Sequence, residues 1–116
     1  MGIRGDSAWN VPEPELVLVL YRGKVVGYSV GNDMTSRAIL RNGAEVFNGE
    51  TSTAQMARRY GDLVEWLTRH NTLPEVSALF TGTVIVPPPD FTLKPGDVVR
   101  IAIDGIGVLE NDVIQV

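Results

Sequence analysis

A run of aliphatic residues directly behind two prolines constrains the fold more than any other feature of the sequence. Residues 15–21 are rich in Val and Leu, which predicts a buried strand. Pro12 and Pro14 have no backbone N–H to pair, so they are typical of a strand entry or a sheet edge. Arg-Gly-Lys at 22–24 predicts a turn, and residues 25–30 predict the return strand. The sequence therefore predicts a β-hairpin.

Turn signals divide much of the remaining chain into short strands. Asn42-Gly43 is a dipeptide typical of tight hairpin turns, and Lys-Pro-Gly-Asp at 94–97 predicts another turn. Residues 33–36 resemble the start of a short helical turn. The further strands that we expect lie at residues 39–41, 44–47, 78–86, 98–103, 105–109 and 113–116.

A single helix is expected over residues 52–70. Ser52 with Gln55 three residues later resembles a capping box. Apolar residues then recur at helical spacing, at positions 56, 60, 63, 64 and 67. His70, the one histidine, falls at the predicted end of this helix, where the helix dipole favours it. The fold class is therefore expected to be α+β, mainly β, in a single domain over residues 1–116.

Composition and charge argue against several classes of protein. The formal net charge is -4 and the isoelectric point about 4.8, whereas nucleic acids and anionic membranes select basic patches. The chain has no cysteine, which excludes disulfides, thiolate metal sites and a cysteine nucleophile. No apolar run approaches the roughly 20 residues that span a bilayer, and residues 1–10 lack the apolar segment of a signal peptide. We expect a cytoplasmic protein.

Three carboxylates are placed where the predicted hairpin would bring them together. Glu13 and Glu15 are two residues apart, so on a strand they face the same side. Asp33 comes just beyond the return strand, at the same end of the hairpin. Like charges this close need a counter-charge, and oxygen ligands suit Mg²⁺, Mn²⁺ or Ca²⁺. The alternative is a solvated group of acids that never meet.

Three blocks of sequence, in this order, resemble the fumarylacetoacetate hydrolase superfamily, and within it the 2-keto-3-deoxy sugar acid (arabinonate/pentonate) dehydratases. The blocks are RGDSAWNVPEPELVLVL, VGYSVGNDMTSRAI and TGTVIVPPPDFTLKPGDVVRIAIDGIGVLEN. The resemblance implies mixed sheets in a β-barrel or roll, and a homodimer. It also implies that Glu13, Glu15 and Asp33 bind a catalytic Mg²⁺, that Arg37 contacts substrate, and that Thr83 lines the substrate pocket.

The chemistry that the resemblance implies is a reaction of a 2-keto acid through a metal-stabilised enolate. The divalent ion would act as a Lewis acid on the carboxylate and keto oxygens. The reaction would be dehydration of a 2-keto-3-deoxy sugar acid, or hydrolysis of a C–C bond in an acylpyruvate. Arg37 would hold a substrate oxygen by paired hydrogen bonds; its alternative role is a surface salt bridge.

Two parts of the family pattern have no counterpart in this sequence. One is the region that precedes the first block in the family. The other is a middle segment carrying a lysine that faces the metal site, since SRAI here runs directly into LRNGAEVFNGETSTAQ, which resembles a later block. These differences favour an alternative function, in which the chain is a non-catalytic metal-binding remnant that acts in assembly or as an interaction module.

Overall fold

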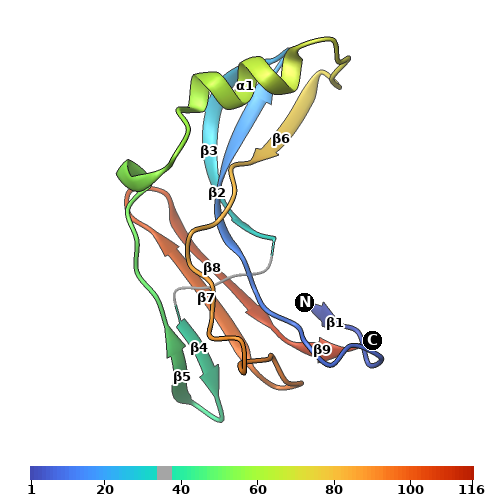
Figure 1. The fold of residues 1–116 in the computed structure, drawn as a ribbon, viewed down its shortest axis with the longest axis vertical. Coiled ribbons are helices and arrows are strands. Elements are labelled where there is room, and N and C mark those ends of the chain that lie inside the picture. Colours follow the sequence, from blue (N-terminus) through green and yellow to red (C-terminus); the bar gives the residue numbers. More distant parts are fainter. Residues whose placement is uncertain (34–37) are drawn as a thin grey trace.

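The computed structural model describes residues 1–33 and 38–116, without the side chains of Ala38 and Ile39. The molecule is elongated, with extents of 43 × 30 × 23 Å. One end holds a three-stranded sheet covered by the helix α1, and the other holds a four-stranded sheet (Figure 1). The helical turn expected at 33–36 lies outside the described residues except for Asp33.

The three-stranded sheet is built on the predicted hairpin. Strands β2 (Pro14–Tyr21) and β3 (Lys24–Asn32) pair antiparallel, and β6 (Val76–Phe80) pairs with the other side of β2. Arg22 and Gly23 both have positive φ, 48° and 74°, as a two-residue turn of type I′ requires. The hairpin is therefore confirmed, with strand bounds within two residues of the prediction.

The helix is shorter than predicted. Helix α1 spans Tyr60–Thr68, and the Ser52 hydroxyl caps a separate 3-10 turn, Thr53–Gln55, by accepting from Ala54 N at 3.2 Å. Residues 51–55 are exposed, so no apolar burial supports an α-helix there. From Tyr60 on, an apolar stripe packs on the buried side chains of β2, and it consists of Tyr60, Val64 and Leu67 over Leu16, Leu18 and Leu20. Tertiary packing, rather than the cap, decides where the helix begins.

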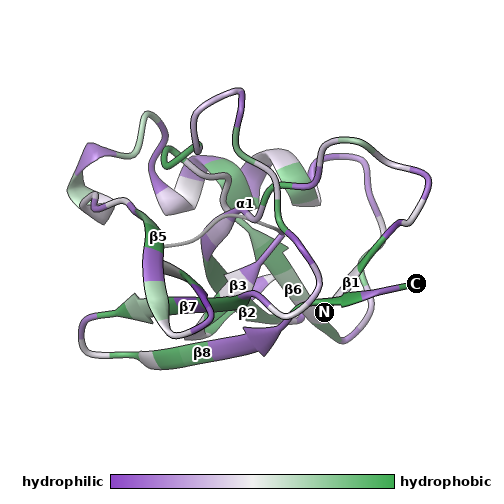
Figure 2. Ribbon diagram, turned by 90° about the horizontal axis from the view of Figure 1, so that it is seen from below, coloured by the Kyte–Doolittle hydropathy of each residue, from purple (hydrophilic) through white to green (hydrophobic). Residues whose placement is uncertain are grey.

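The four-stranded sheet has the order β5-β4-β7-β8 and is antiparallel. Its strands are β4 (Ala38–Arg41), β5 (Ala44–Asn48), β7 (Val98–Ile103) and β8 (Gly107–Asp112). Figure 2 shows that β8 changes from hydrophobic to hydrophilic along its length. Beside this sheet, β1 (Gly2–Ile3) and β9 (Ile114–Gln115) form a short parallel pair. A second small core lies here, made of Ile3, Leu93, Val99, Ile101 and Val113.

Two expectations about the strands need correction. The strand predicted at 78–86 ends at Phe80. Thr81 N still bonds to Leu16 O in the register of the β2–β6 pair (3.2 Å), but Gly82 adopts a positive φ of 87° and its N bonds to the Glu15 side chain, which takes the chain out of the sheet. The predicted barrel is also not closed, since the described strands form three separate sheets. The fold class itself, mainly β with one helix and with both parallel and antiparallel pairing, is confirmed. No helix in the described part of the chain has the length and apolarity needed to cross a membrane.

A buried ion pair holds the turn that precedes β7. Asp97 is 1% exposed and accepts two hydrogen bonds from Arg41, from Nε at 2.9 Å and Nη2 at 3.0 Å. Its carboxylate also accepts from Lys94 N at 2.9 Å. Burial alone would raise the pKa of Asp97, but these bonds outweigh it, so the pKa is lowered. The pair joins the end of β4 to the turn.

Candidate metal and substrate site

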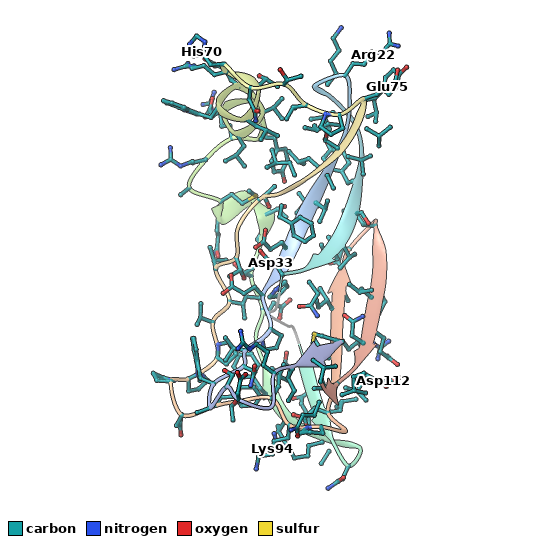
Figure 3. The ribbon with its side chains drawn as sticks, turned by 90° about the vertical axis from the view of Figure 1, so that its right-hand side faces the viewer. Arg22, Asp33, His70, Glu75, Lys94 and Asp112 are labelled. Atoms are coloured by element: carbon teal, nitrogen blue, oxygen red, sulfur yellow. The ribbon has the colours of Figure 1, made fainter. Side chains whose placement is uncertain are left out.

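The register of the first hairpin ends next to the predicted ligands. Pro14 pairs with Asn32, and Glu15 with Gly31. Glu13 and Asp33 lie one residue beyond the ends of these strands, and the same register continued by one residue would set them opposite each other. Side chains that are directly opposite in an antiparallel pair share a face, and Glu15 shares the face of Glu13. Asp33 lies near the middle of the long axis of the molecule (Figure 3).

Glu15 is the most constrained of the three acids. Its side chain is 5% exposed, and Oε2 accepts a hydrogen bond from Gly82 N at 2.7 Å. Burial raises the pKa of Glu15, the bond from Gly82 partly offsets this, and the charges of Asp33 and Glu13 raise the pKa further. The three carboxylates are therefore close enough for their charges to interact.

The three acids fit a divalent cation in the chemistry of their oxygen donors. They are hard donors, and their like charges raise the pKa of Glu15, which a cation would reverse. Within residues 1–33 and 38–116, however, no three Asp, Glu or His side chains are yet arranged as a group that could hold a metal ion. An ion would therefore bind here only when these side chains turn toward one another.

A cavity of about 360 Å³ opens beside Glu15. Its apolar part includes Val84, Ile85 and Ile101, and its polar part includes Thr81, Ser52 and Asp104. Glu13 and Asp33 are not among the described residues that line it. The cavity thus meets the predicted metal site at Glu15 and combines an apolar wall with hydroxyl and carboxylate groups, as small-molecule sites do.

The substrate residues predicted from the sequence have different outcomes. Arg37 lies outside the described residues. The Thr83 hydroxyl accepts from Ile85 N at 3.2 Å, and Thr83 is not among the described lining residues, whereas its neighbours Gly82 and Val84 are. The role of Thr83 in a substrate pocket stays a prediction.

Sequence reasoning missed several residues of the cavity. The hydroxyl of Thr81 donates to Leu16 O at 2.9 Å, which fixes the chain next to Glu15. Glu50 and Asp104 bring two further carboxylates to the lining. The Thr-Gly-Thr block pointed to this segment, but the pattern could not tell which threonine lines the cavity. His70 lies at one end of the molecule, the same end as Arg22 and Glu75 but on the other side, whereas Asp33 lies near the middle (Figure 3).

Comparisons with known proteins match this chain to one family. Residues 40–114 match the family described as Fumarylacetoacetate (FAA) hydrolase C-terminal. A probable 2-keto-3-deoxyxylonate dehydratase of Haloferax volcanii is 38% identical, over all of this chain and 55% of the relative. A 2-dehydro-3-deoxy-D-arabinonate dehydratase of Saccharolobus solfataricus is 30% identical, over 94% of this chain and 51% of the relative. The chain thus spans about half the length of these curated relatives.

Solved structures show the same likeness. A structure of 2-keto-3-deoxy-D-arabinonate dehydratase complexed with magnesium and 2,5-dioxopentanoate has a TM-score of 0.93 and 30% identity, and the match covers 100% of this chain and 57% of the other. The apo form of that enzyme matches with the same TM-score and identity, over 100% of this chain and 56% of the other. The arrangement of strands and helix is therefore shared with these enzymes.

The relatives also differ from this chain inside the matched region. The alignment with the Haloferax protein spans 158 positions and this chain has 116 residues, so at least 42 positions of the alignment have no counterpart here. The family match begins at Leu40, next to the junction that the sequence places between SRAI and LRNG. The expected absence of a middle segment agrees with both findings.

Proposed function

Because the chain belongs to the fumarylacetoacetate hydrolase family, we propose that it carries the metal-binding acids of a divalent-metal-dependent enzyme acting on a 2-keto acid. One observation supports the proposal: Pro14 pairs with Asn32 and Glu15 with Gly31, and this register, continued by one residue, would set Glu13 opposite Asp33 with Glu15 on the same face. The raised pKa of Glu15, caused first by burial and then by its acidic neighbours, supports it. Mg²⁺ is the proposed ion, with Mn²⁺ or Ca²⁺ as substitutes.

Each protein group has a defined task in this proposal. A bound ion would supply Lewis acidity at the keto and carboxylate oxygens of the substrate and stabilise the charge that develops beside the carbonyl. Gly82 N holds Glu15 in place through Oε2. Arg37 would pair with a substrate oxygen, and Thr83 would border the substrate. The apolar residues that line the cavity would reduce the access of water to the bound substrate.

Dehydration of a 2-keto-3-deoxy sugar acid is the reaction that we favour over C–C bond hydrolysis. Both relatives described above are named as dehydratases of such acids. The cavity beside Glu15 offers Thr81, Ser52 and Asp104 as hydrogen-bonding groups for a polyhydroxy chain.

The alternative is a non-catalytic, metal-binding remnant of the same fold. The observation that favours it is the set of at least 42 alignment positions of the Haloferax relative that this chain lacks. In this case the ion would stabilise the fold or an assembly without turnover.

The proposed ion is tested by thermal unfolding of the chain in EDTA, Mg²⁺ and Mn²⁺, for the wild type and Glu13→Gln. An ion that binds only the folded state stabilises it by about 2.7 kcal/mol at 100 times its dissociation constant. For a domain of this size, that raises Tm by several degrees. We expect this rise in the wild type and its loss in Glu13→Gln.

Two outcomes of this experiment separate the proposals. The absence of any ion effect on the wild-type Tm contradicts the metal site itself. An ion effect without conversion of 2-keto-3-deoxy pentonates, measured by the 2-keto acid product, supports the remnant instead of the enzyme.

We also propose that the chain self-associates as a homodimer. The face of the three-stranded sheet that is turned away from α1 exposes apolar side chains, among them Tyr21, Val76 and Phe80, which are 44%, 66% and 43% exposed. Exposed apolar sheet faces and edges are normally covered. Burial of this face between two copies would remove it from water.

A further inference from the structure

The segment that leads to Glu13 is fixed from a distant part of the chain. The Thr92 hydroxyl accepts a hydrogen bond from Asn10 N at 2.9 Å and donates one to Asn10 O at 3.3 Å. Leu93 N also donates to Asn10 O, at 2.8 Å. Asn10 is therefore held on both sides of its backbone by residues 82 and 83 positions later in the chain.

Pro12 and Pro14 restrict the backbone between the fixed residue Asn10 and the carboxylate of Glu13. Asn10 is followed by Val11, Pro12, Glu13 and Pro14. Each proline has a locked φ, and each residue before a proline is confined to extended conformations. Pro12 is also among the fully buried side chains. Because residues 11–14 have few free backbone dihedrals, the position of Asn10 largely sets the direction of Glu13.

Thr92 is itself anchored on the buried ion pair. Arg41 Nη2 donates to Thr92 O at 3.3 Å while the same guanidinium binds Asp97. The neighbouring Leu93 is 3% exposed and belongs to the core of the four-stranded sheet. Thr92 thus connects the buried Arg41–Asp97 contact and the core of the four-stranded sheet to the entry of β2.

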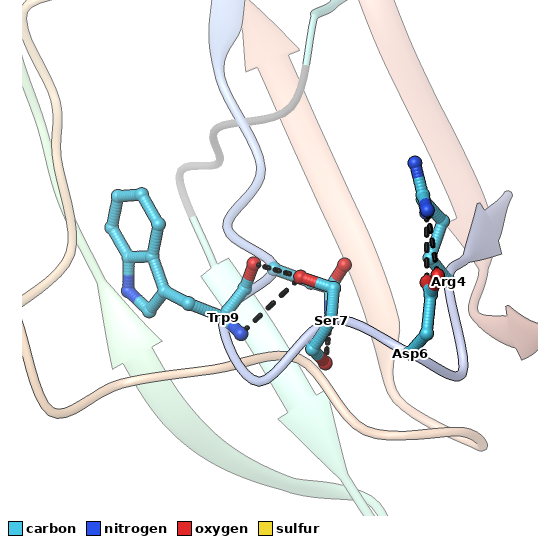
Figure 4. A network of polar contacts seen from close by, with 5 residues as sticks. Arg4, Asp6, Ser7 and Trp9 are labelled. Atoms are coloured by element: carbon cyan, nitrogen blue, oxygen red, sulfur yellow. Dashed lines mark hydrogen bonds and ion pairs between the residues drawn. The ribbon is translucent and has the colours of Figure 1, made fainter.

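Within the described residues, the side chains of the loop before Asn10 make local contacts and do not anchor Asn10 to a core strand. Ser7 Oγ donates to Trp9 O at 2.9 Å, and Arg4 binds Asp6, so its side-chain contacts are local (Figure 4). Asn10 Nδ2 donates to Ser7 O at 3.3 Å, again within the loop. Among the described contacts of the loop's own side chains, none ties Asn10 to a core strand, which leaves that task to Thr92 and Leu93.

We propose that Thr92 is a positioning residue for the metal site, acting on Glu13 through the backbone of Asn10. The inference rests on the proposed function, since it concerns the placement of a proposed metal ligand. Groups that orient ligands in this indirect way typically change metal affinity by 10–100-fold when removed. Because Glu13 lies three positions after Asn10 in the chain, we expect an effect of about 10-fold, at the lower end of that range.

The experiment compares Mn²⁺ affinity, measured by electron paramagnetic resonance, in the full chain and three variants. Thr92→Val removes both side-chain hydrogen bonds and keeps the shape, whereas Thr92→Ser keeps the hydroxyl. Thr68→Val is the matched control, because the Thr68 hydroxyl donates to Val64 O at 2.9 Å. The Thr68 methyl group lies near the Gly23 turn, at the other end of the hairpin. We expect affinity to fall about 10-fold in Thr92→Val alone.

A second readout keeps the inference separate from the proposed function. Backbone order parameters of Val11 and Glu13, from ¹⁵N relaxation in EDTA, are expected to fall in Thr92→Val and to stay unchanged in Thr68→Val. If the wild type binds no Mn²⁺, the proposed function fails and the order parameters decide the positioning role. Equal Mn²⁺ affinity in Thr92→Val and wild type, or unchanged order parameters, overturns the inference. Thr92→Ala replaces Thr92→Val if valine prevents folding.

Discussion

Two regions of the molecule bury a carboxylate, and they do so in opposite ways. At the turn before β7, Asp97 is 1% exposed and accepts hydrogen bonds from Nε and Nη2 of Arg41. At the entry of β2, Glu15 is 5% exposed, accepts from Gly82 N, and has two acids as its neighbours. The pKa of Asp97 is lowered and that of Glu15 is raised.

The two carboxylates differ in whether a positive charge within the chain pairs with them. Asp97 is paired with Arg41, whereas the charges that act on Glu15 are those of Asp33 and Glu13. The charge of Asp97 is neutralised within the chain, so its ionised form belongs to the folded state. The ionised form of Glu15 is opposed by burial and by like charges. Such perturbed acids beside a cavity are typical of functional sites, and a cation is the partner that would make the two regions alike.

The largest expected effect is that of breaking the Arg41–Asp97 pair. Asp97→Ala leaves Arg41 without its partner and Lys94 N without its acceptor. Removing one partner of a buried pair typically costs about 3–5 kcal/mol, and because Arg41 is partly exposed we expect about 3 kcal/mol. Urea unfolding measures this loss.

The control for that experiment is Asp6→Ala. Asp6 pairs with Arg4 at 2.6 Å, but both side chains are exposed, and such pairs contribute little. We expect the midpoint of unfolding to stay close to that of the wild type. Equal losses in the two variants would show that the burial of Asp97 has no consequence, and the comparison of the two regions would lose its basis.

A smaller effect of opposite sign is expected at Glu15. Glu15→Gln removes the buried charge while its amide oxygen can still accept from Gly82 N. In EDTA at neutral pH, we expect the free energy of unfolding to rise by about 1 kcal/mol, because replacing an uncompensated buried charge by a neutral group is often stabilising. Added Mg²⁺ is expected to stabilise the wild type but not this variant.

The pH profile of the same variant sharpens the comparison. The folded-state pKa of Glu15 lies above its ordinary value of 4.5, so the folded state binds this proton more tightly. The contribution of Glu15 to stability therefore falls as pH rises from about 4.5 through the folded-state pKa. Glu15→Gln should lack this fall in EDTA. A wild-type profile without it would contradict the raised pKa.

Asp97 should produce the reverse behaviour. Its folded-state pKa lies below the ordinary value of 3.8, so its contribution is complete above that pH and is lost as pH falls further. The two acids thus act in neighbouring pH windows with opposite signs.

The sequence by itself determined the elements whose signals are local. In the Arg22-Gly23 and Asn42-Gly43 turns, Gly23, Asn42 and Gly43 adopt the positive φ values that glycine and asparagine tolerate. The β2–β3 hairpin follows from these local signals. The shared face of Glu13, Glu15 and Asp33 is the prediction that strand periodicity adds to it.

Only the tertiary structure decided the features that depend on distant partners. The capping pattern at Ser52 predicts a helix start there, but α1 begins at Tyr60, where its apolar side chains pack on those of β2. The strand expected to reach residue 86 ends at Phe80, because Gly82 adopts a positive φ and its backbone N–H bonds to the Glu15 side chain instead of a partner strand. The partner of Asp97 lies 56 residues away in the chain. Sequence patterns record propensity, whereas these contacts depend on which surfaces meet when the chain folds.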